Sequence, residues 1–432
     1  MKPSPLKSIM PSVDQCANDT LHYPKLREIV EQFYSEEYET VDEIFDRFDL
    51  SEDSFAGISN AYFPVIALKI QEARTPMDQV VWSERLTQLS LAQFGQPDEL
   101  EVQGLIGEEY AYLSALQQRH SIDQKLAEPL LATYKRVLDQ FSGAEVATSH
   151  HYTTLLISIN EYLHERYRHA FDTLKKYKDT DILTVQDITV AYEQMMQRIA
   201  ENVPRFRDWR VVLTDSTQMA VSPRRKHVQV GRFLPPLTAL RVKSLFTHEV
   251  LVHAQRSVRG SGESPLLAYG LPGYMTAEEG LGSLMEAAIE KKMPHRIVDR
   301  YIDIALALGF GELPALTRKQ LFAVAYGRTL LRQKHDGLTI ADATTRLAVW
   351  QHVNRIYRGT LGNDIVGVVT KDLIYYRGFQ EMAEYLSRYR SLDLKRAIDF
   401  VLSGKMNPLS PSHRLYVHKR RFNVTTKRRS EI

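Results

Sequence analysis

Apolar residues recur every three or four positions along most of this chain, the spacing that places them on one face of a helix. The pattern predicts helices over residues 62–72, 78–94, 100–141, 155–176 and 185–203, and again from about 295 to 353. An acidic stretch over 24–55 also has helical spacing. We interpret it as a solvated helix face, with docking of a basic partner as the alternative.

The hydrophobic pattern changes between residues 209 and 231, where apolar and polar residues alternate as they do in strands. Strands are predicted near 209–213, 218–221 and 227–230, as a small antiparallel hairpin or three-stranded sheet. An exposed edge of such a sheet can pair with an extended peptide. A purely structural hairpin explains the same pattern, so both interpretations stay open.

Composition narrows the class of protein. The 432 residues are 44% hydrophobic and 25% charged, with a formal net charge of +2, which is ordinary for a soluble globular protein and gives no argument for nucleic acid or membrane binding. The single cysteine, Cys16, excludes a disulfide within the chain and any cysteine-based zinc site. No run of about 18 apolar residues is present, so we expect a cytoplasmic protein.

The candidate chemistry begins in the apolar segment 245–255, which contains His248, Glu249 and His253. Zinc proteases often place two histidines on one helix as ligands, with a glutamate that activates water. Here the histidines are five positions apart, which on a regular helix separates them by about 140°. Metal binding therefore requires a π-bulge or a helix end between Glu249 and His253. Two unrelated histidines are the alternative.

A catalytic zinc needs a third protein ligand, and the next acidic residues lie in a predicted helix that begins near Thr276. The candidates are Glu278, Glu279, Glu286 and Glu290. Thr276 with Glu279 also fits a capping box, which is the structural alternative for Glu279. Gly280 and Gly282 would permit a close helix approach and favour the front of this helix.

Two later clusters, over 355–359 and 370–378, combine arginine, lysine and tyrosine. A peptidase that acts at a chain end needs a cation for the terminal carboxylate and a donor for the oxyanion. Ordinary surface charges on a helix are the alternative explanation.

The run from His248 to His253, followed by Glu279 within Glu278-Glu279-Gly280-Leu281, resembles the microtubule-associated tyrosine carboxypeptidase family. Its bacterial relatives are labelled flavohaemoglobin-expression-modulating proteins with a Gln-Glu-Gly-Leu-Ala motif. The two later clusters resemble that family's C-terminal motifs, and the resemblance covers roughly residues 200–380. The box reads Glu-Glu-Gly-Leu-Gly here, which keeps the acidic residue at Glu279.

This resemblance implies a zinc metallopeptidase that removes a C-terminal residue, which in the animal members is the tyrosine of tubulin. His248, His253 and Glu279 would bind one Zn²⁺, and Glu249 would be the general base. We further predict that Tyr375 or an arginine stabilises the oxyanion. The substrate carboxylate is assigned to a cation among Arg358, Lys371 and Arg377.

The predicted fold is α+β and mainly α-helical, a zincin-like metallopeptidase with a small antiparallel sheet beside the metal-binding helix. We predict a loose tail over 1–20, a helical region over 21–200, a catalytic region over 201–410 and a basic tail over 411–432. The substrate would be a peptide or protein C-terminus, and the basic tail would suit an acidic partner, with nucleic acid the weakest option. A zinc endopeptidase or aminopeptidase, or a noncatalytic regulatory protein, are the alternative functions.

Overall fold

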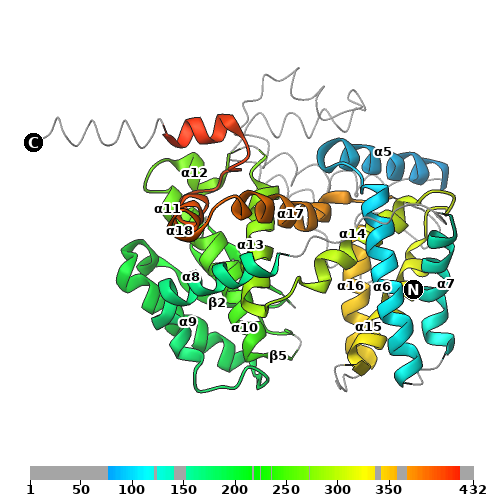
Figure 1. Ribbon diagram of the computed structural model, residues 1–432, viewed down its shortest axis with the longest axis horizontal. Helices are drawn as coiled ribbons and strands as arrows, with labels where there is room; N and C mark the ends of the chain where they lie inside the picture. Colours follow the sequence, from blue (N-terminus) through cyan, green and yellow to red (C-terminus); the bar gives the residue numbers. More distant parts are fainter. Residues whose placement is uncertain are drawn as a thin grey trace, which may run out of the picture. The chain divides into compact units, whose positions relative to one another are not determined.

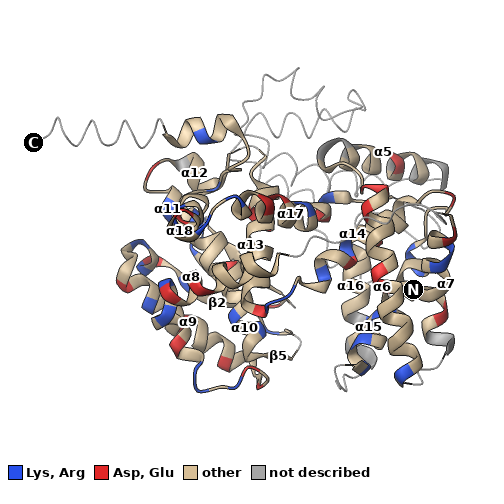
Figure 2. Ribbon diagram, viewed as in Figure 1, with Lys and Arg blue, Asp and Glu red and all other residues tan. Residues whose placement is uncertain are grey.

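The computed structural model describes residues 76–418 except 121–123, 141–151, 217, 224, 235, 272, 336–341 and 358–366. Within these residues the chain is mainly helical with a small sheet, as predicted (Figure 1). Lys and Arg are interspersed with Asp and Glu over its helices, in keeping with the small net charge (Figure 2). None of the helices described is both long and apolar enough to cross a membrane. The predicted tail over 1–20, the acidic stretch over 24–55, the predicted helix over 62–72 and residues 419–432 of the basic tail lie outside the described residues.

The chain forms two compact units, each built from two separate segments. The first combines Met1–His150 with Val298–Leu373, and the second combines His151–Ile297 with Ile374–Ile432. Residue 201, where we predicted the catalytic region to begin, lies inside the second unit. Two helices that we placed in the N-terminal region belong to the unit that carries the histidine motif.

The described residues of the first unit form helices joined by loops, with one isolated β-bridge between Phe310 and Leu313. Its helices are α5 (Pro76–Phe94), α6 (Glu99–His120), α7 (Gln124–Gln140), most of α14 (His295–Leu308), α15 (Arg318–His335), α16 (Asp342–Ile356) and the short η6 (Thr370–Asp372). At its centre Arg328 is buried and donates to Asp303 Oδ1 at 3.0 Å and to Tyr134 Oη at 3.0 Å. His352 Nε2 lies 2.6 Å from Asp303 Oδ2. Together these contacts join α15 to α14 and α7, and α14 to α16.

The second unit surrounds the histidine motif with helices. They are α8 (Thr153–Phe171), η3 (Asp172–Leu174), α9 (Val185–Asn202), η4 (Pro204–Asp208), α10 (Ala239–Phe246), η5 (Thr247–Ala254), α11 (Gln255–Gly260), α12 (Pro265–Tyr269), α13 (Met275–Glu290), α17 (Leu373–Ser387) and α18 (Ser391–Val401). Most residues of α13 are buried, and it contacts α8, α10 and η5. It therefore forms the core against which the motif packs.

The three-stranded sheet has the order β2–β4–β3, with β2 at Arg210–Thr214, β3 at Met219–Ser222 and β4 at His227–Gly231. β3 and β4 pair antiparallel, but β2 and β4 pair parallel, so the prediction of a purely antiparallel sheet was wrong. The tight turn before β4, where Lys226 has φ 54°, fixes only the β3–β4 hairpin. β2 instead joins the other edge of β4. β1 (Ile182–Leu183) and β5 (Leu237–Thr238) form a separate two-stranded pair. Both β3 and β4 contact η5, so the predicted position of the sheet is confirmed.

The close helix approach that we predicted at the front of α13 is made with α17. A Cβ atom on Gly280 would lie 2.0 Å from the carbonyl carbon of Gly378. A Cβ atom on Gly378 would lie 2.0 Å from the carbonyl oxygen of Thr276. Only glycine at both positions lets the two backbones approach this closely.

Candidate metal centre

The segment that carries the two histidines is a π-helix, η5, between α10 and α11. The N–H of Gln255 donates to the carbonyl of Val250, five residues earlier, which is the wide turn of a π-helix. Such turns return positions i and i+5 to the same face. The rewinding that the spacing of His248 and His253 required is therefore confirmed.

The rewound backbone brings the two imidazoles together. Their ring centroids lie 4.8 Å apart with an interplanar angle of 75°. His248 Nε2 is 3.5 Å and His253 Nε2 is 3.6 Å from the same atom, Glu279 Oε2. Ligand atoms of His248, Glu249 and His253 also lie within 4.8 Å of one another. Four side chains from two helices thus meet at one point.

The spacing of these atoms fits a zinc ion. Ligand atoms about 2.0–2.1 Å from a tetrahedral zinc are separated by about 3.3–3.4 Å from one another. The distances from Glu279 Oε2 to the two Nε2 atoms, 3.5 and 3.6 Å, are close to this value. Imidazole nitrogen and carboxylate oxygen are also donors that zinc accepts. His248, His253 and Glu279 would hold the ion.

Each imidazole is oriented by a second carboxylate on its other nitrogen. His253 Nδ1 lies 2.8 Å from Glu278 Oε1, and His248 Nδ1 lies 3.0 Å from Glu286 Oε2. Metal-binding histidines have this arrangement because the second hydrogen bond fixes the tautomer and the ring. We had treated Glu278 and Glu286 only as alternative third ligands. Their position on a nearly fully buried helix was the available signal, since a buried carboxylate needs a partner.

Buried cations hold these two orienting carboxylates in place. Glu278 accepts from Arg256 and, at 2.7 Å, from Lys405 Nζ. Burial raises the pKa of Glu278, but the charges of Lys405 and Arg256 outweigh it and the pKa is lowered. Arg256 is fully buried and also donates from Nε to the carbonyl of Gly404 at 2.9 Å. Glu278 is therefore a fixed anion behind His253.

The second orienting carboxylate, Glu286, has the same kind of support. It is fully buried and pairs with Arg241 and Arg296. Burial raises the pKa of Glu286, but the charges of Arg296 and Arg241 lower it by more. The pKa is therefore well below its ordinary value. Glu290 lies away from the histidines, since it accepts from Arg241 and from Ser244 Oγ at 2.7 Å.

Glu279 is not a helix cap, so the capping-box alternative was wrong. α13 begins at Met275 with Tyr274 at the N-cap position, and no side chain caps it. Thr276 lies inside the helix. Among the described residues, the side chains that pair with the Glu279 carboxylate are His248 and His253. Burial raises the pKa of Glu279, but His253 and His248 lower it more.

The electrostatics of the group favour a cation between these side chains. Burial lowers the pKa of His253, but Glu279 and Glu278 outweigh it and raise the pKa to about 10. Burial raises the pKa of Glu249, against the lowering effect of His253 and His248. A protonated imidazole or a bound metal ion satisfies the same surplus of carboxylate charge.

Gly282 completes the packing around the first histidine. A Cβ atom at this position would lie 2.7 Å from Cε1, 2.8 Å from Nε2 and 2.9 Å from Nδ1 of His248. Only a glycine leaves room for the imidazole beside α13. In the Glu-Glu-Gly-Leu-Gly box, Gly282 thus makes room for the imidazole of His248, and Gly280 makes room for the backbone of α17.

The other predicted residues are brought to the site only in part. Tyr375 lies on α17, with the guanidinium carbon of Arg296 5.9 Å from its ring centroid, and Arg296 in turn holds Glu286. Arg377 is half-buried on the same helix. Lys371 belongs to the other compact unit, and Arg358 lies outside the described residues.

We compared the chain with protein families, curated proteins and solved structures, and none of them matched.

Proposed function

We propose that this protein is a zinc-dependent metallocarboxypeptidase of zincin-like arrangement. The observation that carries the proposal is the meeting of His248 Nε2, His253 Nε2 and Glu279 Oε2 at distances suited to one tetrahedral ion. The buried carboxylates on both Nδ1 atoms support it, because unrelated histidines do not need such orientation. The resemblance to the tyrosine carboxypeptidase family supplies the reaction, and it remains a prediction.

The ion would supply Lewis acidity and activation of water near neutral pH. Glu249 follows the first ligand directly and lies within reach of the same point. It would accept a proton from the attacking water and pass it to the leaving amine.

Substrate binding is proposed for the sheet and for α17. β3 is an edge strand of its sheet and contacts η5, so an extended peptide could add to it beside the candidate centre. Tyr375 would donate to the oxyanion, and Arg377 is the described cation on the same helix that could hold the terminal carboxylate.

A library of peptide C-termini tests this function, with the products identified by mass. The zinc-loaded protein should remove a single C-terminal residue from peptides with a free carboxylate and should leave the same peptides intact when the C-terminus is amidated. Glu249→Gln should retain zinc and lose about 10²- to 10⁴-fold in turnover. Cleavage of amidated peptides would instead indicate an endopeptidase or an aminopeptidase. Equal turnover by Glu249→Gln would refute the role of Glu249 as base.

A further inference from the structure

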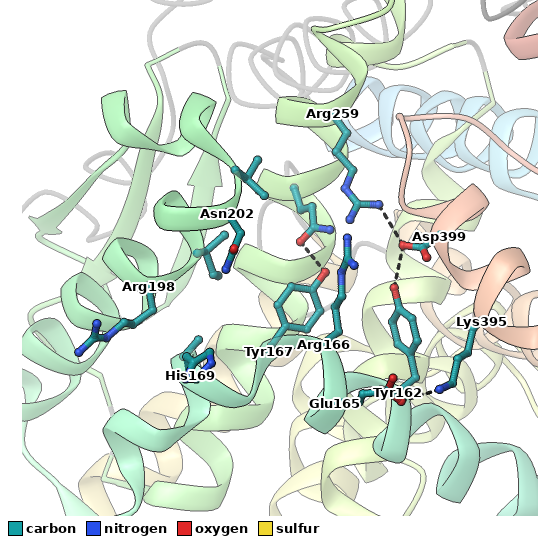
Figure 3. Close-up of a pocket in the computed structure, with 14 residues that line it drawn as sticks. Tyr162, Glu165, Arg166, Tyr167, His169, Arg198, Asn202, Arg259, Lys395 and Asp399 are labelled. Carbon is teal, nitrogen blue, oxygen red and sulfur yellow. Dashed lines mark hydrogen bonds and ion pairs between the residues drawn. The ribbon is translucent and has the colours of Figure 1, made fainter. Parts of the chain in front are cut away.

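A cavity in the second compact unit is lined by helices that do not supply the candidate zinc ligands. Its volume is about 590 Å³, within the range of small-molecule pockets. The lining residues come from α8, α9, α11 and α18 (Figure 3). Ala170, Ile199 and Val203 provide apolar surface, and Tyr162 and Tyr167 provide aromatic surface. The pocket can therefore take an organic body as well as a charged group.

Cations outnumber acids in this pocket. Arg166, Arg198, Arg259 and Lys395 line it, against the carboxylates of Glu165 and Asp399. Three of the four cations have carboxylate partners. Lys395 pairs with Glu165 at 2.5 Å, Arg198 pairs with Glu201 at 2.9 Å, and Arg259 lies 3.4 Å from Asp399.

The fourth cation, Arg166, has no hydrogen bond or ion pair among the described residues. Figure 3 shows Arg166 and Arg259 reaching toward each other from opposite sides of the pocket. Burial raises the pKa of the neighbouring Tyr167 phenol, while Arg259 and Arg166 both act to lower it. Two guanidinium groups thus share one space, and only one of them has a carboxylate.

Arg259 is held in position before any ligand arrives. Gln255 is fully buried, and its hydrogen bonds are satisfied when its amide nitrogen donates to Tyr167 Oη at 2.8 Å. In this orientation the amide oxygen of Gln255 accepts from Nε and Nη2 of Arg259 at 3.0 and 2.9 Å. Asp399, which also accepts from Tyr162 Oη at 2.9 Å, restrains the other end of the guanidinium. A fixed guanidinium loses little conformational freedom when it binds an anion.

We propose that this pocket binds a small organic anion, a molecule with a phosphate or carboxylate group that is gripped by Arg166 and Arg259. A planar guanidinium suits either group because it can donate two parallel hydrogen bonds. The anion would neutralise the surplus charge of Arg166, and the tyrosines and apolar residues would contact its body. This site is separate from the candidate zinc ligands and does not depend on the proposed peptidase activity.

Isothermal titration calorimetry on the full chain tests the proposal, with inorganic phosphate, glycerol 3-phosphate and succinate as ligands at constant ionic strength. Saturable binding of at least one anion is expected. Arg166→Ala should weaken it about tenfold or more, the loss of one charged hydrogen-bonding pair. Arg168→Ala is the matched control, because Arg168 is an exposed arginine on the same helix that does not line the pocket. The affinity of Arg168→Ala for the anion should equal that of the parent protein.

Glu279→Ala separates this pocket from the candidate metal centre and should leave anion binding unchanged. Three results would overturn the proposal. One is the absence of saturable binding by all three anions. Another is an equal loss in Arg166→Ala and Arg168→Ala, which would indicate general charge attraction. The third is binding of a hexaglutamate peptide without any of the small anions, which would make the pocket a docking site for acidic protein segments.

Discussion

Gly282 offers a direct test of how tightly the candidate zinc centre is built. In Gly282→Ala the new methyl group would lie 2.7 Å from Cε1 of His248, whereas carbon atoms in contact normally lie about 3.5–4.0 Å apart. The imidazole must therefore retreat by about 1 Å. Zinc–ligand distances tolerate only about 0.2 Å, so His248 Nε2 would leave the position that Glu279 and His253 define.

We expect the affinity of Gly282→Ala for zinc to fall by about a hundredfold or more, at least the loss seen when an orienting partner is removed. Competition with a chromophoric chelator measures it, and circular dichroism checks the fold. Alanine favours helix over glycine by about 1 kcal/mol, so loss of α13 itself is not the expected cause. Ser283→Ala is the control, since its buried hydroxyl has no hydrogen-bond partner among the described residues. Parental zinc affinity in Gly282→Ala would refute the reasoning.

Three further predictions concern the support of the site and of each unit. Glu286→Gln weakens the carboxylate behind His248 and should lower zinc affinity about 10- to 100-fold in the same chelator assay, and an unchanged affinity would remove Glu286 from its orienting role. Gly378→Ala should lower the free energy of unfolding by about 2 kcal/mol in urea, because its methyl group meets the carbonyl of Thr276, and equal stability would argue against the close crossing of α13 and α17. Burial raises the pKa of Asp303, but Arg328 and His352 lower it below the ordinary value, so the stability that ionised Asp303 contributes is present above its unfolded pKa and lost as the pH falls. Asp303→Asn should therefore show a shallower decline in unfolding free energy between about pH 5 and pH 2, and a parental slope would contradict the assignment.

The sequence predicted the features that depend on local spacing. Apolar periodicity located the helical segments among the described residues, although it joined α6 to α7 and α14 to α15 and α16 as single runs. The five-residue interval between His248 and His253 required the π-helix that the structure has. The glycines of the acidic box indicated close packing at the front of α13. These predictions succeeded because helix geometry relates the position of a residue to the face on which it lies.

Features that depend on distant segments were missed. The turn before β4 specifies the β3–β4 hairpin, but nothing local specifies that β2 joins the far edge of β4 in parallel. The orienting roles of Glu278 and Glu286 were also missed. They depend on Lys405 and on arginines of α10, α11 and α14, which reach α13 only in the folded chain.

Zinc content per chain, measured by elemental analysis after removal of free metal, tests the central claim most directly. The parent protein and Glu290→Ala should each retain one zinc ion, because Glu290 lies on α13 but bonds to Arg241 and Ser244. Glu279→Ala should lose it, since the two imidazoles would have no third protein ligand. Full retention of zinc by Glu279→Ala would contradict the ligand set of His248, His253 and Glu279.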